Sequence, residues 1–373
     1  MSNPNQANRI KLLDQSYSKL SQLIQRLGHK EFRSKQVWKW LHQKNCSDFS
    51  QMKNLSKDLI KDLNKCCIIN TLNLDSIQYS NDGSIKFLFN IDKNNAIESV
   101  LIPEKDRLTL CISTQAGCAM ACAFCSTGDQ GFNRQLTLGE IVGQLWYVNK
   151  YLKKDNIAFK TKVSNVVLMG MGEPLANYRA TLDALKIFLD DHAYGLSRRR
   201  VTVSTCGLTS AILQLAKDCP VSLAISLHAP NDQLRSQIMP INRRYPIAEL
   251  INACKQYIKS APRLKVLIEY VLIKGINDSS KTCMEFAQLI KNLNCKVNLI
   301  PFNRYPNSKF PAPNQEQVVD FANKLMKASK KTVIIRKSRG NDIAGACGQL
   351  SGKIDDIRHK KIVNNTITEV VLN

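Results

Sequence analysis

The stretch LTLCISTQAGCAMACAFCST, residues 108 to 127, decides the fold. It places an apolar run typical of a β-strand directly before Cys118, Cys122 and Cys125, in the spacing C-x-x-x-C-x-x-C. Thiolates are soft ligands that bind iron–sulfur clusters and zinc, and a complete set normally has four cysteines or a mixture of cysteine and histidine. Three thiolates leave one metal position open. On a cubane cluster, that open iron can bind a small molecule through its nitrogen and oxygen atoms.

Two other interpretations of the three cysteines compete with a cluster. They could be buried core residues, or they could form a zinc site with Cys111 as fourth ligand. The thiols are surrounded by small residues, which let the backbone approach a bulky inorganic group, whereas a hydrophobic core would use larger side chains. These small residues are Ala116, Gly117, Ala119, Ala121 and Gly128. They favour the cluster.

Composition points to a polyanionic partner. The 373 residues contain 53 Lys and Arg against 30 Asp and Glu, a formal net charge of +23. Such an excess attracts nucleic acid, and a merely solvated surface could be built with balanced charge. We therefore expect RNA or DNA as the partner.

Cysteine usage and hydropathy point to the cytoplasm. The thirteen cysteines follow no disulfide rhythm, and neither a secretory signal nor an apolar run long enough to span a bilayer is evident. We expect reduced thiols and metal ligands, no membrane association, and by default a monomer.

Hydrophobic periodicity divides the chain into four parts. Residues 1–70 read as a small basic helical domain that contacts RNA or simply packs on the rest, with Leu55, Leu59 and Leu63 at spacing four. Residues 71–105 alternate as a β-meander linker with a turn at 81–83, and this meander carries Glu98. Residues 106–340 alternate strands with helices, and residues 341–373 form a C-terminal segment.

Seven strands are expected in the third part, at 108–113, 163–169, 200–204, 221–227, 264–273, 296–301 and 332–336. Strand and helix repetition implies a parallel sheet, which could be an open doubly wound sheet or a barrel. Candidate ligand-contacting residues, most of them polar, follow several of these strands, and a barrel presents its ligands there. They are Gly172, Glu173, Ser204, Ser226, Leu227, His228 and Asn303. The fold class is therefore α/β, a partial TIM-like barrel with a small N-terminal helical domain.

Two further cysteines attract interest. Cys111 lies on the first barrel strand, and Cys347 lies in the glycine-containing segment GNDIAGACGQL. A reactive cysteine belongs on an exposed, mobile loop of that kind. Alternatively, Cys111 is a core residue and Cys347 has no role.

The cysteine spacing resembles the signature of radical S-adenosylmethionine (SAM) enzymes, whose fold is a partial (βα)6 barrel. The segments AIESVLIPE, LCISTQAGCAMACAFCSTG, NVVLMGMGEPLANY, VTVSTCGL, AISLHAPND, LIPFN and RGNDIAGACGQL together resemble the RlmN family. These are radical SAM methyltransferases that modify C2 of adenine in 23S rRNA and in tRNA. The resemblance implies a 4Fe–4S cluster and SAM as cofactors, and an external, flavodoxin-like electron donor.

The resemblance also implies residue roles. Cys118, Cys122 and Cys125 would hold the cluster, and the polar residues after the strands would contact SAM. Cys347 would take a methyl group from one SAM molecule and deliver its carbon to C2 of adenine, forming a covalent link to RNA. Glu98 would accept the C2 proton, and Cys111 would attack Cys347 to form a disulfide and release the product.

Two other functions remain as alternatives. A Cfr-type enzyme shares these cysteines but methylates C8 of adenine, and the long N-terminal unit favours C2. A non-catalytic RNA-binding protein with a zinc site is the alternative from another class.

Overall fold

The computed structural model describes residues 9–154, 162–306 and 308–353. The first eight residues of the expected N-terminal domain and residues 354–373 of the expected C-terminal segment lie outside this range. Within the described residues the main sheet has ten strands, in the order β14-β13-β12-β11-β10-β9-β6-β5-β4-β3.

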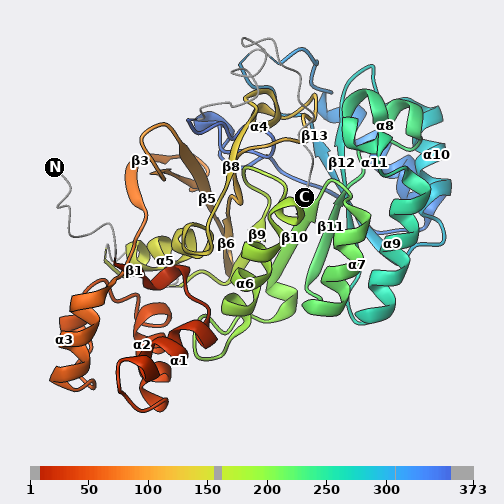
Figure 1. Ribbon diagram of the computed structural model, residues 1–373. Coiled ribbons are helices and arrows are strands. Elements are labelled where there is room, and N and C mark those ends of the chain that lie inside the picture. The colour runs from red at the N-terminus through yellow and green to blue at the C-terminus, as the bar shows by residue number, and fades with distance from the viewer. Residues whose placement is uncertain (1–8, 155–161, 307, 354–373) are drawn as a thin grey trace, which may run out of the picture.

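Parallel strands form the larger part of this sheet. Neighbouring strands from β6 to β14 pair in parallel, and helices connect most of them, so the partial α/β barrel is confirmed (Figure 1). Each of the seven expected strands is present in the described residues: β6 (Arg107–Cys111), β9 (Asn165–Leu168), β10 (Val201–Thr205), β11 (Ser222–Ser226), β12 (Val266–Leu272), β13 (Cys295–Pro301) and β14 (Val333–Ile335). Val, Ile and Leu dominate these strands because both faces of such a sheet are covered.

The antiparallel meander continues the same sheet. It consists of β3 (Asn73–Tyr79), β4 (Ile85–Asn90) and β5 (Ala96–Glu104), and β5 pairs antiparallel with β6. Gly83, with φ +85°, supplies the left-handed turn between β3 and β4. The meander is therefore an extension of the barrel sheet.

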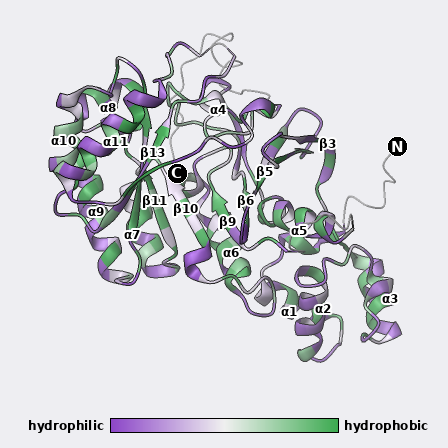
Figure 2. Ribbon diagram, turned by 180° about the vertical axis from the view of Figure 1, so that it is seen from behind, coloured by the Kyte–Doolittle hydropathy of each residue, from purple (hydrophilic) through white to green (hydrophobic). Residues whose placement is uncertain are grey.

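Helices cover the outside of the barrel. They are α5 (Leu138–Lys154), α6 (Tyr178–Leu189), α7 (Thr209–Asp218), α8 (Asp232–Ile238), α9 (Ile247–Ser260), α10 (Ser280–Ile290) and α11 (Gln315–Ser329). Their apolar positions pack on the strands and their polar positions face outward, which appears in Figure 2 as green and purple alternating along each helix. Side-chain hydrogen bonds cap the N-termini of several of these helices. At α11, for example, Asn314 and Gln317 form a capping box.

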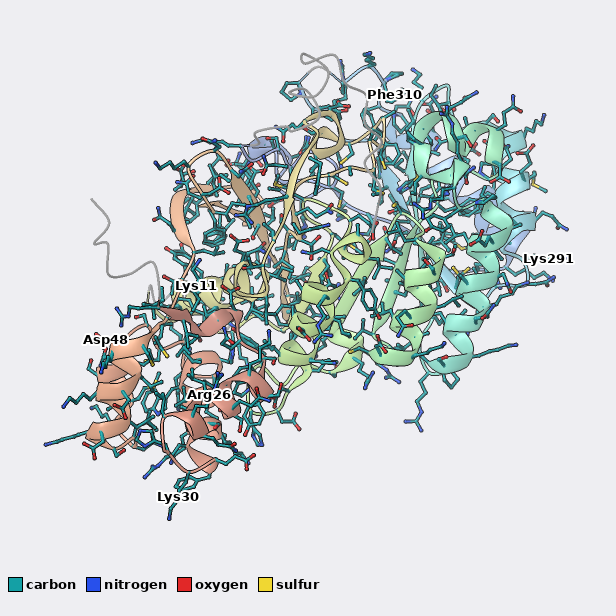
Figure 3. All side chains as sticks on the ribbon, in the orientation of Figure 1. Lys11, Arg26, Lys30, Asp48, Lys291 and Phe310 are labelled. Atoms are coloured by element: carbon teal, nitrogen blue, oxygen red, sulfur yellow. The ribbon has the colours of Figure 1, made fainter. Side chains whose placement is uncertain are left out.

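The N-terminal unit is helical, as expected. It contains β1 (Ile10–Lys11), η2 (Leu12–Asp14), α1 (Tyr17–Arg26), α2 (Phe32–His42), η3 (Phe49–Gln51), α3 (Lys57–Cys66) and β2 (Cys67–Ile68). Two tryptophans fix it to the barrel: Trp38 Nε1 donates to Asp190 at 2.9 Å, and Trp146 Nε1 donates to the Leu41 carbonyl at 2.8 Å. Figure 3 shows Lys30 at the lower end of this unit.

Candidate active site

A two-stranded ribbon frames the cysteine loop. Strands β7 (Gln115–Gly117) and β8 (Phe132–Gln135) pair antiparallel, and the short helix α4 (Ser126–Asp129) follows the third cysteine. Cys118 N donates to the Gly131 carbonyl at 2.6 Å, which closes the loop. A Cβ on Gly117 would lie 2.1 Å from that carbonyl oxygen, so only glycine fits there.

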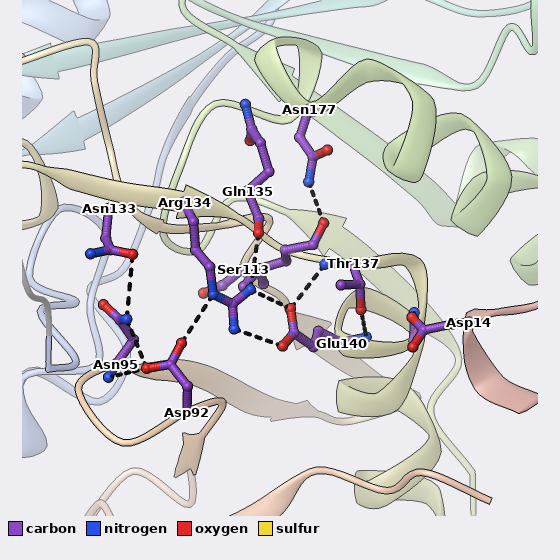
Figure 4. Close-up of polar contacts among 12 residues, drawn as sticks. Asp14, Asp92, Asn95, Ser113, Asn133, Arg134, Gln135, Thr137, Glu140 and Asn177 are labelled. Carbon is purple, nitrogen blue, oxygen red and sulfur yellow. Dashed lines mark hydrogen bonds and ion pairs between the residues drawn. The ribbon is translucent and has the colours of Figure 1, made fainter. Parts of the chain in front are cut away.

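An arginine holds this ribbon against the barrel (Figure 4). Arg134 on β8 makes a two-pronged contact with Glu140 of α5, both at 2.8 Å, and its Nε donates to Asp92 at 3.0 Å. Bidentate guanidinium–carboxylate pairs fix orientation as well as distance. The cysteine loop is thereby anchored to both the meander and the first barrel helix.

The three cysteines open into a cavity of about 170 Å³ at the carboxyl ends of the parallel strands. Most of the ligand-contacting residues expected at the strand ends line it as well. Those lining the cavity are Gly172, Glu173, Ser204, Ser226 and His228, together with Cys118, Cys122, Cys125 and Cys347.

Leu227 and Asn303 do not line this cavity. Leu227 is buried, and its backbone N–H and C=O bond the Glu269 carbonyl and Arg235. Asn303 lines a neighbouring cavity and donates from Nδ2 to the Cys347 carbonyl at 3.2 Å. Asn303 thus supports the cysteine of the C-terminal segment.

Glu173 is a buried carboxylate held by backbone donors. It follows Gly172 after β9 and begins the 3-10 helix η4 (Pro174–Asn177). Its two oxygens accept from Leu175 N at 2.9 Å and Cys206 N at 2.7 Å. Burial raises the pKa of Glu173, and these hydrogen bonds oppose the rise. The carboxylate retains lone pairs for a cationic group in the cavity.

His228 is fixed as a neutral ring. Val271 N donates to its Nδ1 at 2.9 Å, so Nε2 carries the proton, and Phe124 packs edge-on at 4.7 Å. Burial, with a smaller contribution from Arg235, lowers the pKa of His228 to about 3. Its φ of 59° is unusual for a side-chain-bearing residue and is held by Asn277, which donates to the His228 carbonyl. His228 therefore offers the cavity one N–H donor.

The donor set fits an iron–sulfur cluster. Burial raises the pKa of Cys122 and Cys125, so both need a metal to be thiolates near neutral pH. In the described residues, no three His, Cys, Asp or Glu side chains lie close enough together to hold one metal ion. Cys111, the fourth ligand of the zinc interpretation, does not line this cavity.

A second cavity, of about 560 Å³, adjoins the first. Cys111 and Cys347 both line it, and Cys347 lies in the wall shared with the first cavity. Burial raises the pKa of Cys111 to about 12, and nearby Cys347 adds to the rise. Cys347 is exposed, as expected for a reactive thiol. Desolvation by the groups packed around its sulfur raises the pKa of Cys347, and Arg336 opposes this. All thirteen cysteines are free thiols in this structure.

The wall of the second cavity is basic. It contains Arg107, Lys296, Arg336, Lys337 and Arg339. Glu104 is the carboxylate in this wall, and Arg107 pairs with it. This cavity therefore suits an anionic ligand such as a phosphate-bearing chain.

Glu98 lines neither cavity. Its carboxylate is buried, pairs with Lys86 Nζ at 3.0 Å and accepts from Ser351 N at 2.8 Å. Lys86 also reaches the Ala344 carbonyl at 3.4 Å. The pair ties the meander to the segment that carries Cys347.

Sequence reasoning missed several buried polar residues. Glu269 on β12 lies in register with Ser226 and Asn298, accepts from Asn298 Nδ2 at 2.7 Å, and lines the first cavity. Burial raises the pKa of Glu269. Arg235 on α8 is completely buried. Glu269 could have been found as a charged residue inside an apolar run. No such signal marked Arg235, because arginines are common on the exposed faces of helices.

Comparison with known proteins identifies the family. Residues 10–69 match the Ribosomal RNA large subunit methyltransferase N-terminal domain, and residues 112–287 match the Radical SAM superfamily. A crystal structure of a radical SAM methyltransferase from Sphaerobacter thermophilus is 40% identical, with 91% of this chain and 99% of that chain covered and a TM-score of 0.85. The chain belongs to the RlmN family of radical SAM methyltransferases. Radical SAM enzymes use a 4Fe–4S cluster and SAM, which are therefore its cofactors.

Two other solved structures show a fainter likeness. Streptococcus suis SuiB bound to S-adenosylmethionine is 16% identical, with 63% of this chain and 48% of that chain covered and a TM-score of 0.44. A domain of pyruvate-formate lyase-activating enzyme from Bacteroides vulgatus is 18% identical, with 47% and 99% covered and a TM-score of 0.37. Among the described residues, no helix of this RlmN-family chain combines the length and apolarity needed to cross a membrane.

Proposed function

We propose that this protein methylates C2 of adenine in 23S rRNA and in tRNA through a methyl group carried on Cys347. The observation that supports this most directly is the position of Cys347 in the wall shared by the two cavities. One cavity holds the three-cysteine loop, and the other is basic. A carrier between a methyl donor and RNA must reach both.

The three-cysteine loop would hold the cluster, with SAM in the same cavity. Glu173 would take the ammonium group of SAM, and Ser204, Ser226 and the Nε2 proton of His228 would supply further polar contacts. Gly172 adopts φ +96°, which glycine tolerates without strain, and its lack of a side chain lets the backbone approach SAM closely. The bound cluster supplies the electron for reductive cleavage of SAM.

Cys347 would act first as a nucleophile. Its thiolate would attack the methyl carbon of a first SAM molecule, so that an S–CH3 bond forms on Cys347 and S-adenosylhomocysteine leaves. Arg336, which opposes the rise in the pKa of Cys347, favours the thiolate. Adenine C2 lies between two ring nitrogens and is not nucleophilic, so the methyl carbon must be activated as a radical before it adds there. The hydrogen atom that it loses would pass to the adenosyl fragment of a second SAM molecule. This addition joins Cys347 to RNA through one carbon atom.

Glu98 and Cys111 would complete the reaction. Glu98 would accept the proton from C2, which requires the segment at Ser351 to move away, because that backbone N–H now occupies the carboxylate. The adduct radical would also give up one electron to the oxidised cluster. Cys111 would then attack the Cys347 sulfur, so that the disulfide forms as the bond from this sulfur to the bridging carbon breaks, and that carbon takes up a proton to become the methyl group of the released base. An external reductant must return both thiols.

RNA would enter through the basic cavity. Arg336, Lys337 and Arg339 line it beside Cys347, and they suit phosphates next to a base that has left its stack. We also propose the N-terminal unit as an RNA contact, since its matching family model is that of ribosomal RNA methyltransferases. A flavodoxin-like electron donor, a monomeric state and a cytoplasmic location remain predictions from the sequence.

Nucleoside mass spectrometry tests this function. Unmodified 23S rRNA and tRNA are incubated anaerobically with the reconstituted protein, SAM and a reductant. We expect 2-methyladenosine from both RNAs. Formation of 8-methyladenosine would assign the chain to the Cfr-type reaction, and no methylated adenine from a brown, cluster-loaded protein would contradict the proposal.

A cysteine variant tests the carrier. Cys347→Ala should abolish RNA methylation while the visible absorbance of the cluster persists. Cys283→Ala is the matched control, because Cys283 is buried between α10 and α11 and lines neither cavity. Methylation that survives in Cys347→Ala would reject the carrier role.

A further inference from the structure

Arg235 is a charged residue with no contact to solvent. It lies on α8, is 0% exposed, and its guanidinium donates to four oxygen atoms. Nε donates to the Leu227 carbonyl at 3.0 Å, and Nη1 donates to Asn242 Oδ1 at 2.8 Å. Nη2 donates to the carbonyls of Cys206 at 2.7 Å and Ser226 at 3.1 Å. These bonds tie α8 to the ends of β10 and β11.

All four acceptors are neutral. In the described part of the chain, no carboxylate oxygen lies within 4.0 Å of this guanidinium. Asp232 is separated from it by Asn242, whose Nδ2 donates to Asp232 Oδ1 at 3.0 Å. A buried charge is costly unless an opposite charge compensates it. Arg235 therefore has no carboxylate in direct contact, and Asp232 acts on it only across Asn242.

The cysteine loop lies on the same side of α8. Cys206, whose carbonyl accepts from Arg235, is in one apolar cluster with Ile238, and Cys118 and Cys122 pack against that cluster. Ala123 N also donates to the Ile238 carbonyl at 3.0 Å, where α8 ends. Helix α8, which carries Arg235, therefore contacts the backbone of the loop between Cys122 and Cys125.

We propose that Arg235 is a positioning residue whose fixed positive charge raises the reduction potential of the cluster. This inference rests on the proposed assignment of Cys118, Cys122 and Cys125 as its ligands. A 4Fe–4S core of charge 2+ with three thiolates has net charge −1, and one added electron makes it −2. A nearby buried cation stabilises the more negative form more strongly, since the interior screens charges poorly.

The step involves one electron and no proton. An external low-potential one-electron donor is oxidised, the cluster core is reduced from 2+ to 1+, and no bond to Arg235 forms or breaks. Because Arg235 also holds the Ser226 and Cys206 carbonyls, it links the cluster environment to the strand ends that line the first cavity.

A potentiometric titration followed by electron paramagnetic resonance tests the role. Dithionite reduces the reconstituted full-length protein without SAM or RNA, and the midpoint potential of the cluster is measured. Arg235→Gln should shift the midpoint to a more negative value, whereas Arg235→Lys, which keeps the charge, should stay near the wild type. Arg179→Gln is the control, because Arg179 is exposed on α6 and pairs with Asp183 away from the cysteine loop, and its midpoint should not change.

Two results would overturn the inference. One is an unchanged midpoint in Arg235→Gln, and the other is an equal shift in Arg235→Gln and Arg235→Lys, which would indicate lost packing. If Arg235→Gln does not fold, Asn242→Asp places a carboxylate against the arginine, and an unchanged midpoint there would also contradict the inference. A wild-type protein that binds no iron would instead reject the proposed cluster ligands.

Discussion

Lys86 and Glu98 form an ion pair inside the protein, with Nζ and Oε1 3.0 Å apart and both side chains less than a tenth exposed. They lie on the adjacent strands β4 and β5, and the free side of the carboxylate accepts from the backbone of Ser351. The pair therefore fixes the backbone of the C-terminal segment at Ala344 and Ser351.

Removing Lys86 should destabilise the protein strongly. Lys86→Met leaves the buried Glu98 carboxylate without its partner, and such changes cost roughly 3 to 5 kcal/mol of unfolding free energy. Arg107→Met is the matched control, because the Arg107–Glu104 pair is exposed and should contribute less than ~1 kcal/mol. Urea denaturation followed by circular dichroism measures both. Equal losses of unfolding free energy in the two variants would show that the buried pair stabilises the protein no more than the exposed pair does.

Gly172→Ala should weaken SAM binding. Gly172 has φ +96°, and an added Cβ would lie 2.4 Å from Cβ of Gln115 beside the first cavity. We expect the Kd for SAM to rise at least tenfold, or about 1.4 kcal/mol. Equilibrium dialysis with the cluster-loaded protein measures this.

Gly275→Ala is the control that separates the steric clash at Gly172 from the strain of a positive φ. Gly275 also has a positive φ, +74°, but a Cβ there would meet nothing within 4 Å. This variant should lose about 1 kcal/mol of stability from backbone strain and bind SAM like the wild type. A similar loss of SAM binding in both variants would count against close packing at Gly172.

Acid should destabilise the protein through its buried histidines. Burial lowers the pKa of His42 to about 3 and is the main cause that lowers the pKa of His228 to about 3. Both stay neutral in the folded state, while an unfolded histidine binds a proton below about pH 6.5. Their contribution to stability is therefore complete above pH 6.5 and is lost as the pH falls toward 3.

His42→Phe should reduce this acid sensitivity. Between pH 6 and 5, the slope of unfolding free energy against pH should fall by about one proton, or ~1.4 kcal/mol per pH unit. Thermal or urea unfolding at several pH values measures the slope. An unchanged slope would mean that His42 is protonated in the folded state.

Cys111→Ala should trap the reaction. If Cys111 resolves the link between Cys347 and RNA, its removal should leave a covalent protein–RNA species that migrates slowly on a denaturing gel. Cys254→Ala, in which a buried cysteine outside both cavities is changed, should show no such band. Free methylated RNA from Cys111→Ala would exclude the resolving role.

The sequence predicted the strands and the cysteine loop because their signals are local. Apolar runs such as NVVL and VLIEYVL fix strands β9 and β12, and the spacing of Cys118, Cys122 and Cys125 is visible along the chain. The N-terminal helices were equally clear from their period.

The partners of the charged residues could not be predicted in this way. Lys86 meets Glu98 only through the register of β4 and β5, and Glu269 meets Asn298 only through that of β12 and β13. Arg235 is buried because the ends of three elements meet around it. Register and burial depend on contacts distant in sequence, which one sequence does not reveal.

The segment from Gly340 to Lys353 has a consequence for folding. It leaves the β14 edge of the sheet, and in Figure 1 its blue trace lies beside β5, in the other part of the sheet. Gly340 N bonds Asp82, and Lys353 forms a bridge with Ala96, so each contact spans more than 250 positions of the chain. Contacts of such separation close the longest loops and form late. The reactive thiol of Cys347 should therefore reach its place only after the barrel has assembled, so that a partly folded chain lacks the complete carrier site.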